Sequence, residues 1–262
     1  MEALERQIIS GSFLERLRCA PFRVLLLDYD GTLAPFQVDR NRAVPYPEVP
    51  PLIARIMAQG TRVVLISGRP AREVLTLIGT DPTPEIWGSH GLERLLPDGR
   101  YEVGPAPAHQ DHLLAAAALL RDAGLESQTE LKPGGVAVHW RGLEGAKAER
   151  LAREVSQLWK PLLERAPLRL LEFDGGLELR VAGPGKGDAV RAILKESGEG
   201  SAVAYLGDDQ TDEDAFRALT GRGLTVLVRP QSRPTAAEVW LQPPHELLQF
   251  FREWLRASAG GA

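Results

Sequence analysis

Two aspartates one residue apart, Asp28 and Asp30, directly follow the apolar run Val24–Leu27. An apolar run without polar alternation predicts a strand buried on both faces, as in a parallel sheet. Open α/β sheets bind their ligands at the carboxyl ends of such strands. Two carboxylates this close repel each other, and a divalent cation is the expected source of compensating charge. The alternative is a strand that ends in an Asx turn with solvated acids.

Three further segments with chemically capable side chains follow predicted strands or begin predicted helices. Ser67-Gly68 ends an apolar strand with a hydroxyl and an unhindered backbone, which can donate hydrogen bonds to a phosphate. Lys186 lies between two glycines at a predicted helix start, where its ammonium and the helix N-terminus can both face an anion. The last segment follows a buried strand and offers hard oxygen ligands that suit Mg²⁺: Asp208, Asp209 and Asp212.

Each of these segments also has a purely structural interpretation. Ser67-Gly68 can be an ordinary strand-to-helix turn, Lys186 a solvated surface lysine, and Asp212 the N-cap of a helix. What the segments share is their position at strand ends and helix starts, in the order acid pair, serine, lysine, acid cluster. That shared position favours one site for a phosphate and a metal over four unrelated turns.

Composition narrows the possible functions. The chain has 262 residues, of which 44% are hydrophobic and 25% charged, with a net charge of −4. We therefore expect neither nucleic acid nor an anionic membrane as a partner. The single cysteine, Cys19, excludes an internal disulfide and suits the reducing cytoplasm. We recognise neither a membrane-spanning apolar stretch nor an export signal, which also favours a cytoplasmic protein.

The order of predicted elements indicates an α/β fold, with a parallel-sheet core and an inserted domain. Strands and helices alternate at both ends of the chain, which is typical of parallel βαβ units. The middle shows hairpins between helices, which indicates an antiparallel α+β unit. We expect a first core segment at residues 1–104, an α+β cap domain at 105–183 and a second core segment at 184–262.

Hydrophobic periodicity and breaker residues give the expected element boundaries. The expected helices are 2–18, 52–59, 71–78, 109–123, 146–165, 188–197, 212–219 and 244–255. The expected strands are 24–27, 62–66, 85–88, 92–96, 101–103, 130–131, 135–141, 169–173, 177–181, 202–206 and 224–228.

Together, the four segments resemble the motifs of the haloacid dehalogenase superfamily of phosphotransferases, at residues 28–32, Ser67, Lys186 and 207–209. Further stretches are similar to trehalose-6-phosphate phosphatases over nearly the whole chain: 67–69, 88–93, 130–132, 139–141 and 207–216. The resemblance implies a Rossmann-like core whose inserted cap selects the substrate. One departure from the family concerns the hinge before the Lys-Gly pair. Relatives often have a lysine or similar polar residue directly before this pair, whereas this chain has Gly183-Pro184-Gly185.

The superfamily resemblance implies catalytic roles for the core residues. Asp28 would be the nucleophile that forms an aspartyl-phosphate, and Asp30 the general acid and then base. Mg²⁺ would be held by the Asp28 carboxylate, the Asp30 main-chain carbonyl and Asp208. Two sets of supporting residues follow from the same motifs: Ser67, Gly68 and Lys186 for the phosphoryl group, and Asp209 and Asp212 as water-bridged or supporting partners of the metal ligands.

The cap shows two pairs of polar residues at alternate positions, Glu130 with Lys132 and His139 with Arg141. Side chains on a strand repeat every two residues, so each pair shares one face. The alternative is a solvent face with cross-strand ion pairs. The family resemblance implies instead that these residues bind the sugar, together with a cap glutamate and two core residues: Glu178, Arg69 and His90.

We therefore expect an Mg²⁺-dependent phosphatase that releases trehalose from trehalose 6-phosphate. The alternatives are a related phosphatase for sucrose 6-phosphate, mannosyl-3-phosphoglycerate or glucosyl-3-phosphoglycerate, and a non-catalytic sugar-phosphate sensor. The presence of Asp28, Asp30, Lys186 and Asp208 argues against the sensor. We expect a cytoplasmic monomer, with a functional association with a trehalose-6-phosphate synthase as a further option.

Overall fold

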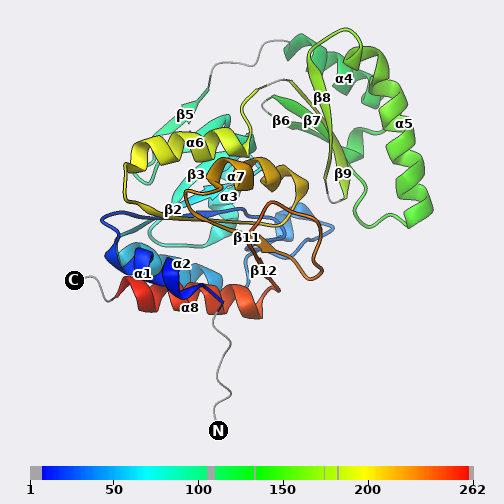
Figure 1. The fold of residues 1–262 in the computed structure, drawn as a ribbon. Helices are drawn as coiled ribbons and strands as arrows, with labels where there is room; N and C mark the ends of the chain where they lie inside the picture. Colours follow the sequence, from blue (N-terminus) through cyan, green and yellow to red (C-terminus); the bar gives the residue numbers. More distant parts are fainter. Residues whose placement is uncertain (1–7, 105–109, 133, 174, 182, 260–262) are drawn as a thin grey trace.

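The structure, a computed structural model, describes residues 8–104, 110–132, 134–173, 175–181 and 183–259. It consists of two domains, each built around its own sheet (Figure 1). The larger domain is formed by both ends of the described chain, and the smaller one by the middle of the sequence. The smaller domain lies over the carboxyl ends of the central strands of the larger one (Figure 1). Residues of both domains line a pocket between them.

An eight-stranded sheet forms the centre of the larger domain. Its strands are Arg23–Leu27 (β1), Thr61–Ile66 (β2), Glu85–Gly88 (β3), Glu93–Leu95 (β4), Tyr101–Val103 (β5), Ala202–Gly207 (β10), Leu224–Val228 (β11) and Val239–Leu241 (β12). They follow the order β12-β11-β10-β1-β2-β3-β4-β5. The strands from β12 to β3 are parallel, and β4 and β5 add an antiparallel edge. Because β1 lies between β2 and β10, the two core segments of the chain meet in the middle of the sheet.

Helices cover both faces of this sheet. They are Gly11–Cys19 (α1), Val49–Ala58 (α2), Ala71–Ile78 (α3), Lys186–Ser197 (α6), Glu213–Leu219 (α7) and His245–Ser258 (α8). In β1, Leu25 and Leu27 pack with α1, α2, α3 and α8, whereas Val24 and Leu26 pack with α6 and α7 on the opposite face. Each such burial stabilises the fold by about 1.5–3 kcal/mol. The predicted strand with two buried faces is therefore confirmed.

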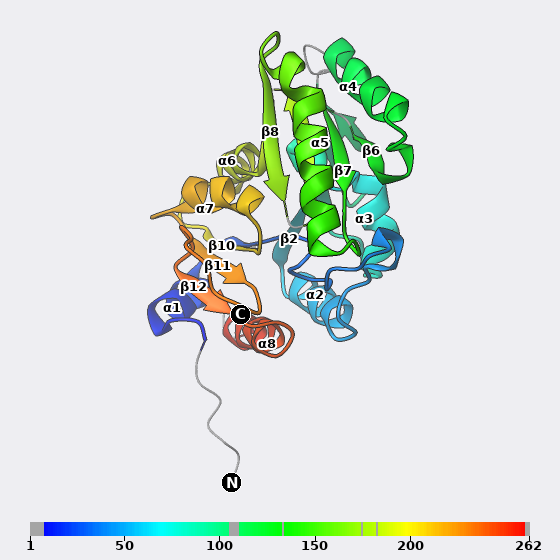
Figure 2. The ribbon, with the colours of Figure 1, turned by 90° about the vertical axis from the view of Figure 1, so that its right-hand side faces the viewer.

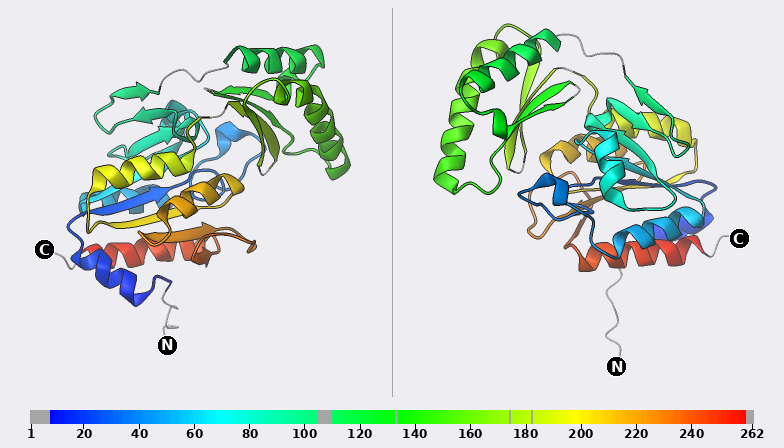
Figure 3. Two further views of the ribbon diagram at one scale, coloured as in Figure 1. Left: turned by 45° about the horizontal axis from the view of Figure 1, so that its top comes forward. Right: turned by 180° about the vertical axis from the view of Figure 1, so that it is seen from behind.

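The smaller domain is a four-stranded antiparallel sheet with two helices on its outer face (Figures 2 and 3). The strands are Thr129–Lys132 (β6), Gly135–His139 (β7), Leu168–Phe173 (β8) and Gly176–Val181 (β9), in the order β6-β7-β9-β8. The helices are Gln110–Asp122 (α4) and Gly145–Leu163 (α5). Within the described ranges, no helix of either domain has the length and apolarity that crossing a membrane requires.

The two faces of the cap sheet differ in polarity. Val136 and Leu179 are paired neighbours on β7 and β9, and both pack under α4 and α5. The next row across the sheet points the other way and joins Glu130, Ala137 and Glu178. This alternation follows from the two-residue repeat of a strand. It leaves carboxylates on the face that meets the core.

Most expected elements occur, with boundaries displaced by at most three residues. The expected helix 2–18 is wrong over residues 8–10, since α1 begins at Gly11 with Ser10 as its N-cap, and residues 2–7 lie outside the described ranges. Helix α6 begins at Lys186 and not at 188. Strand β12 was not expected, because a three-residue edge strand is too short to show a period. The domain boundaries 104/105 and 183/184 stay predictions.

A buried carboxylate fixes the turn that enters the cleft after β3. Glu93 is 2% exposed and accepts hydrogen bonds from the Ser89 hydroxyl, from the Ala71 N–H at 3.0 Å and from the Tyr101 hydroxyl at 2.9 Å. These contacts join the start of α3, strand β5 and the 3-10 turn Ser89–Gly91. Glu93 thereby holds the turn that carries His90.

Replacing Glu93 with alanine leaves three donors without their acceptor. We expect Glu93→Ala to lower the free energy of unfolding by about 2–4 kcal/mol, because orphaned buried polar groups carry their full desolvation cost. The matched control is Glu102→Ala, an exposed glutamate on β5, which should change it by no more than about 0.5 kcal/mol. Urea unfolding followed by circular dichroism measures both values. Similar small changes in both variants would contradict the structural role given to Glu93.

Candidate functional site

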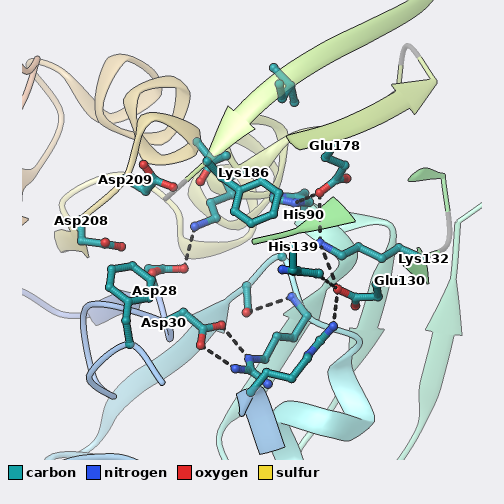
Figure 4. A pocket seen from close by; sticks show the side chains of 18 of the residues that line it. Asp28, Asp30, His90, Glu130, Lys132, His139, Glu178, Lys186, Asp208 and Asp209 are labelled. Atoms are coloured by element: carbon teal, nitrogen blue, oxygen red, sulfur yellow. Dashed lines mark hydrogen bonds and ion pairs between the residues drawn. The ribbon is translucent and has the colours of Figure 1, made fainter. Parts of the chain in front are cut away.

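A pocket lies between the two domains, at the carboxyl ends of β1, β2 and β10 (Figure 4). Core residues such as Asp28 and Lys186 line one side, and the cap residues Glu130, Lys132 and Glu178 line the other. Every site residue predicted from the sequence except Asp212 lines this pocket: Asp28, Asp30, Ser67, Gly68, Arg69, His90, Glu130, Lys132, His139, Arg141, Glu178, Lys186, Asp208 and Asp209.

The Lys186 ammonium lies between two buried carboxylates. Its Nζ donates to Asp28 Oδ1 at 2.6 Å and to Asp212 Oδ1 at 2.7 Å. None of these three side chains is more than 5% exposed. Lys186 stands in the first turn of α6, so the partial positive charge of the helix N-terminus adds to its own. The site thus concentrates positive charge directly beside Asp28.

Asp212 holds this arrangement from behind the pocket. Its Oδ1 also accepts a hydrogen bond from the Tyr205 hydroxyl at 2.5 Å. Its Oδ2 accepts from the backbone N–H groups of Asp208 at 3.0 Å and Asp209 at 2.9 Å. Asp212 therefore positions both Lys186 and the acidic turn after β10. Tyr205 was not predicted as a site residue, although it lies in β10, three residues before Asp208.

Burial and mutual repulsion shift the pKa values of these groups. Burial, opposed by Lys186 and reinforced by Asp212, raises the pKa of Asp28 to about 7. Burial, followed by the charges of Asp28 and Asp212, raises the pKa of Asp208 well above its ordinary value. Burial alone would lower the pKa of Lys186, but the two carboxylates outweigh it and raise that pKa. One ammonium thus faces a surplus of negative charge.

The carboxylates fit a divalent cation. One oxygen from each of Asp28, Asp208 and Asp212 lies within 4.8 Å of the others, and all three residues are buried. Both carboxylate oxygens of Asp208 are buried and have no hydrogen-bond partner among the described residues. Buried charges are ordinarily paired or bound to metal, so Asp208 lacks a partner that a hard cation can supply.

A glycine makes room for this cluster. Gly31 has φ of +82°, and a Cβ atom there would lie 2.2 Å from Asp208 Oδ2. The close approach of the β1 turn to the acidic turn of β10 therefore requires a residue without a side chain.

Asp30 is held by an arginine. Arg69, only 4% exposed, donates from Nε and Nη2 to the two carboxylate oxygens of Asp30, both at 2.6 Å. The same guanidinium donates to Glu73, in the first turn of α3. The carboxylate of Asp30 thus points at Arg69 and stands apart from the cluster formed by Asp28, Asp208 and Asp212. In this structure Arg69 orients Asp30, and a contact with sugar stays a prediction.

Ser67 and Gly68 form a tight turn against His90. The Ser67 hydroxyl accepts from the Arg69 N–H at 3.1 Å, and a Cβ on Gly68 would lie 2.7 Å from His90 Nε2. Burial, opposed by Glu178 at 3.5 Å, lowers the pKa of His90 to about 4. His90 is therefore neutral near pH 7, so it can bind a polar ligand without adding charge.

The cap side of the pocket is a set of ion pairs. Lys132 Nζ lies 3.0 Å from Glu178 Oε2 and 3.8 Å from Glu130 Oε2, while His139 Nε2 lies 2.8 Å from Glu130 Oε2. Burial alone would raise the pKa of Glu130, but His139, Lys132 and Arg40 outweigh it and lower that pKa to about 2. Lys132 and His90 likewise lower the pKa of Glu178. Both lowered pKa values favour ionised glutamates, which can accept hydrogen bonds near pH 7.

Several pocket residues were missed by the sequence reasoning. They come from the loop after β1, from β8 and from the acidic turn: Phe36, Arg40, Leu171, Phe173 and Thr211. Arg40 pairs with Glu130, and the Arg141 guanidinium lies 4.4 Å from the centre of the Phe36 ring. Both core residues sit in a proline-rich segment without periodicity, which offers no pattern from which their position could be inferred.

Comparison with known proteins gives a family for this arrangement. Residues 26–244 match the family model described as trehalose-phosphatase. The chain is 33% identical over 245 residues to a trehalose-phosphate phosphatase of Mycobacterium marinum, covering 88% of this chain and 60% of that protein. It is 31% identical over 255 residues to a trehalose 6-phosphate phosphatase of Zea mays, covering 88% of this chain and 69% of that one. The chain thus spans about 60% of the mycobacterial relative.

Solved structures show the same fold. The C-terminal domain of Candida albicans trehalose-6-phosphate phosphatase superposes with a TM-score of 0.80 at 19% identity, covering 94% of this chain and 96% of that one. A haloacid dehalogenase-like hydrolase of Bacteroides thetaiotaomicron gives a TM-score of 0.65 at 16% identity, covering 88% and 98%. The core is therefore the α/β fold of the haloacid dehalogenase superfamily, as predicted. With the match of the family model over most of its length, the chain belongs to the trehalose-phosphatase family.

Proposed function

We propose that this chain is an Mg²⁺-dependent phosphatase that hydrolyses trehalose 6-phosphate to trehalose and phosphate. The observation that carries the proposal is the buried cluster in which Lys186 holds Asp28 while the Asp208 carboxylate has no hydrogen-bond partner among the described residues. A nucleophile flanked by an ammonium and an uncompensated metal ligand is suited to an anionic electrophile, such as a phosphate monoester. Membership of the family supports trehalose 6-phosphate as that ester.

The reaction proceeds in two displacements. The Asp28 carboxylate attacks phosphorus, the bond to the sugar oxygen breaks, and Asp30 gives its proton to that oxygen. Water then attacks the aspartyl-phosphate, Asp30 takes a proton from this water, and phosphate leaves Asp28 free again. Ser67, the backbone at Gly68 and the Lys186 ammonium bind the phosphoryl oxygens during both steps. In the structure Arg69 holds both Asp30 oxygens at the pocket wall, so Asp30 must leave Arg69 and take up a proton before the first displacement.

The metal would be held by the Asp28 carboxylate, the main-chain carbonyl of Asp30 and the Asp208 carboxylate. Asp209 and Asp212 support this set, Asp212 through its hydrogen bonds to the acidic turn. When bound, Mg²⁺ neutralises charge on the phosphoryl oxygens, as a Lewis acid.

The cap face supplies the groups for the sugar. Glu130, Lys132, His139, Arg141 and Glu178 present charged donors and acceptors toward the core side of the cleft. Such groups strongly reject ligands that leave them unpaired, which selects a polyhydroxylated sugar.

Neighbouring functions share this fold. Sucrose 6-phosphate, mannosyl-3-phosphoglycerate and glucosyl-3-phosphoglycerate are alternative substrates for the same chemistry. A chain described as the C-terminal domain of the Candida albicans trehalose synthase regulatory protein also has a TM-score of 0.68 to this one, so fold alone does not separate enzyme from regulator. The intact acid, base and lysine set favours the enzyme. A monomeric state, a cytoplasmic location and a functional association with a synthase remain proposals.

The nucleophile is tested by Asp28→Asn, which keeps the size of the side chain and removes its attacking charge. We expect turnover of trehalose 6-phosphate to fall by roughly a thousandfold or more. Asp30→Asn should be similarly impaired, because both displacements need its proton. Phosphate release and melting temperature are measured together, with Asp98→Asn, an exposed aspartate of the β4–β5 hairpin, as the control. An Asp28→Asn protein with nearly unchanged turnover would exclude the aspartyl-phosphate mechanism.

The metal site is tested by chelation. EDTA should abolish turnover, Mg²⁺ should restore it, and Ca²⁺ should inhibit because its looser coordination misplaces the nucleophile. Asp208→Ala should raise the Mg²⁺ concentration for half-maximal activity by about tenfold or more. Mg²⁺ should also raise the melting temperature of the unaltered protein, more than that of Asp208→Ala.

Asp214→Ala, at an exposed carboxylate next to the acidic turn, is the control for this experiment. Full activity in a metal-free preparation would rule out the site. An unchanged Mg²⁺ requirement in Asp208→Ala would assign the metal to another carboxylate.

The role of the cap is tested with two substrates. Glu130→Ala and Arg141→Ala should lose turnover of trehalose 6-phosphate by about two orders of magnitude, the size expected for a lost charged hydrogen bond. A small chromogenic phosphate ester does not reach the cap and should be hydrolysed at nearly the original rate. Glu149→Ala and Arg153→Ala, an exposed pair on the outer helix α5, are the controls. Equal losses on both substrates would refute sugar selection by these residues.

A further inference from the structure

The loop between β1 and α2 touches the cap at three points. We call residues 35–42 the docking loop. Within it, Arg40 forms an ion pair with Glu130, and the Phe36 ring lies 4.4 Å from the Arg141 guanidinium carbon. A Cβ on Gly142 would lie 3.0 Å from Val38 Cγ1, so the Val38 side chain lies close to the cap backbone there as well. Glu130 and Arg141, two of the cap residues proposed to bind sugar, therefore contact side chains of the core.

Arg40 is itself firmly held on the core side. Its Nη2 lies 2.8 Å from Glu73 Oε2, and its Nε and Nη2 lie 3.2 and 3.0 Å from Glu73 Oε1. A forked contact of this kind fixes the orientation of a guanidinium better than a single hydrogen bond does. Glu73 lies in the first turn of α3, where the helix N-terminus further stabilises its charge.

Glu73 connects the two halves of the site. Besides Arg40, it accepts a hydrogen bond from Arg69, which in turn holds both oxygens of Asp30. Alternating charges thus run from Asp30 through Arg69, Glu73 and Arg40 to Glu130 in the cap. The Arg40 and Glu130 side chains are 25% and 15% exposed, so this contact is less screened than a surface ion pair.

Arg40 is not needed to keep Glu130 charged. His139 and Lys132 already lie beside the same carboxylate, and both belong to the cap. What Arg40 alone adds among these three partners of Glu130 is a link to the core. Phe36 does the same for Arg141, by offering an aromatic face to its guanidinium.

We propose that Arg40 and Phe36 are positioning residues that fix Glu130 and Arg141 against the core, so that the closed cap presents both to the sugar. The proposal rests on the proposed function for the identity of the sugar. It makes substrate selection depend on a core loop, and it makes Glu73 a common support for Arg40 and for the arginine that orients Asp30.

The first test is a comparison of arginine variants. Arg40→Ala should lower kcat/KM for trehalose 6-phosphate by about tenfold, which corresponds to about 1.4 kcal/mol, and mainly by raising KM. Arg40→Lys should recover part of this loss, since lysine keeps the charge but cannot make the forked contact with Glu73. Arg42→Ala, an exposed arginine of the same loop, is the control and should change kcat/KM by less than about twofold.

A double-mutant cycle separates a specific contact from a general weakening. In a Glu130→Gln background, Arg40→Ala should cost less than about twofold, because the partner charge is already lost. The same tenfold loss in both backgrounds would overturn the proposal. So would an unchanged KM for Arg40→Ala in an enzyme that is otherwise active. Phe36→Leu, which keeps an apolar side chain without a ring face, should raise KM, and its effect should shrink when Arg141 is replaced with alanine.

Hydrogen exchange gives a readout that needs no substrate. Arg40→Ala, and not Arg42→Ala, should speed amide exchange in β6 and β7, which carry Glu130 and His139. If the unaltered chain does not hydrolyse trehalose 6-phosphate, the proposed function fails and exchange alone decides whether the loop docks the cap. Unchanged exchange in that case refutes docking, and accelerated exchange supports it.

Discussion

Repulsion among three buried carboxylates is the constraint on which the site depends. Asp28 and Asp208 follow the adjacent parallel strands β1 and β10, so the sheet fixes their separation and side-chain rotation alone cannot take them far apart. Lys186 compensates only part of the charge, and Asp212 uses its other oxygen, Oδ2, to hold the acidic turn in place. The fold thereby keeps a deficit of positive charge at one point. A divalent cation would offset this deficit, and its charge together with that of Lys186 would then make the same point attractive to an anionic phosphate.

The cap sheet combines a polar face toward the core with a stable apolar core of its own. Its helices take one face of the sheet and give it an apolar core, while the other face carries paired charges. Lys132 lies beside both Glu130 and Glu178, so neither carboxylate is buried without a cationic partner. The proposed sugar would have to exchange these contacts for its own hydroxyl contacts, and only a ligand with well-placed hydroxyls would gain from the exchange.

The sequence predicted the framework well because each signal was local. Apolar runs identified β1 and β10, and acids at their ends identified Asp28, Asp30 and Asp208. Alternation on β6 and β7 identified Glu130 and Lys132. The sequence could not reveal contacts between distant segments that lack hydrophobic periodicity. Arg40 lies in an irregular loop, and its partner Glu130 belongs to another domain. The sequence could not reveal that Arg69 pairs with Asp30, because only the folded sheet brings the ends of β1 and β2 together. Its expected contact with sugar stays a prediction.

The strand order of the core determines when its sheet can be completed during synthesis on the ribosome. Strand β1 is made early, yet its neighbour β10 is formed by residues 202–207, after the whole cap has been synthesised. Until then β1 has one open edge, whereas the cap sheet contains all its own partners and can close first. We therefore expect the cap domain to be completed before the core during synthesis. A nascent chain that has reached residue 181 contains every strand of the cap sheet but lacks β10, β11 and β12 of the core, so Asp28 gains Lys186 and Asp208 only when residues 186–208 have been added.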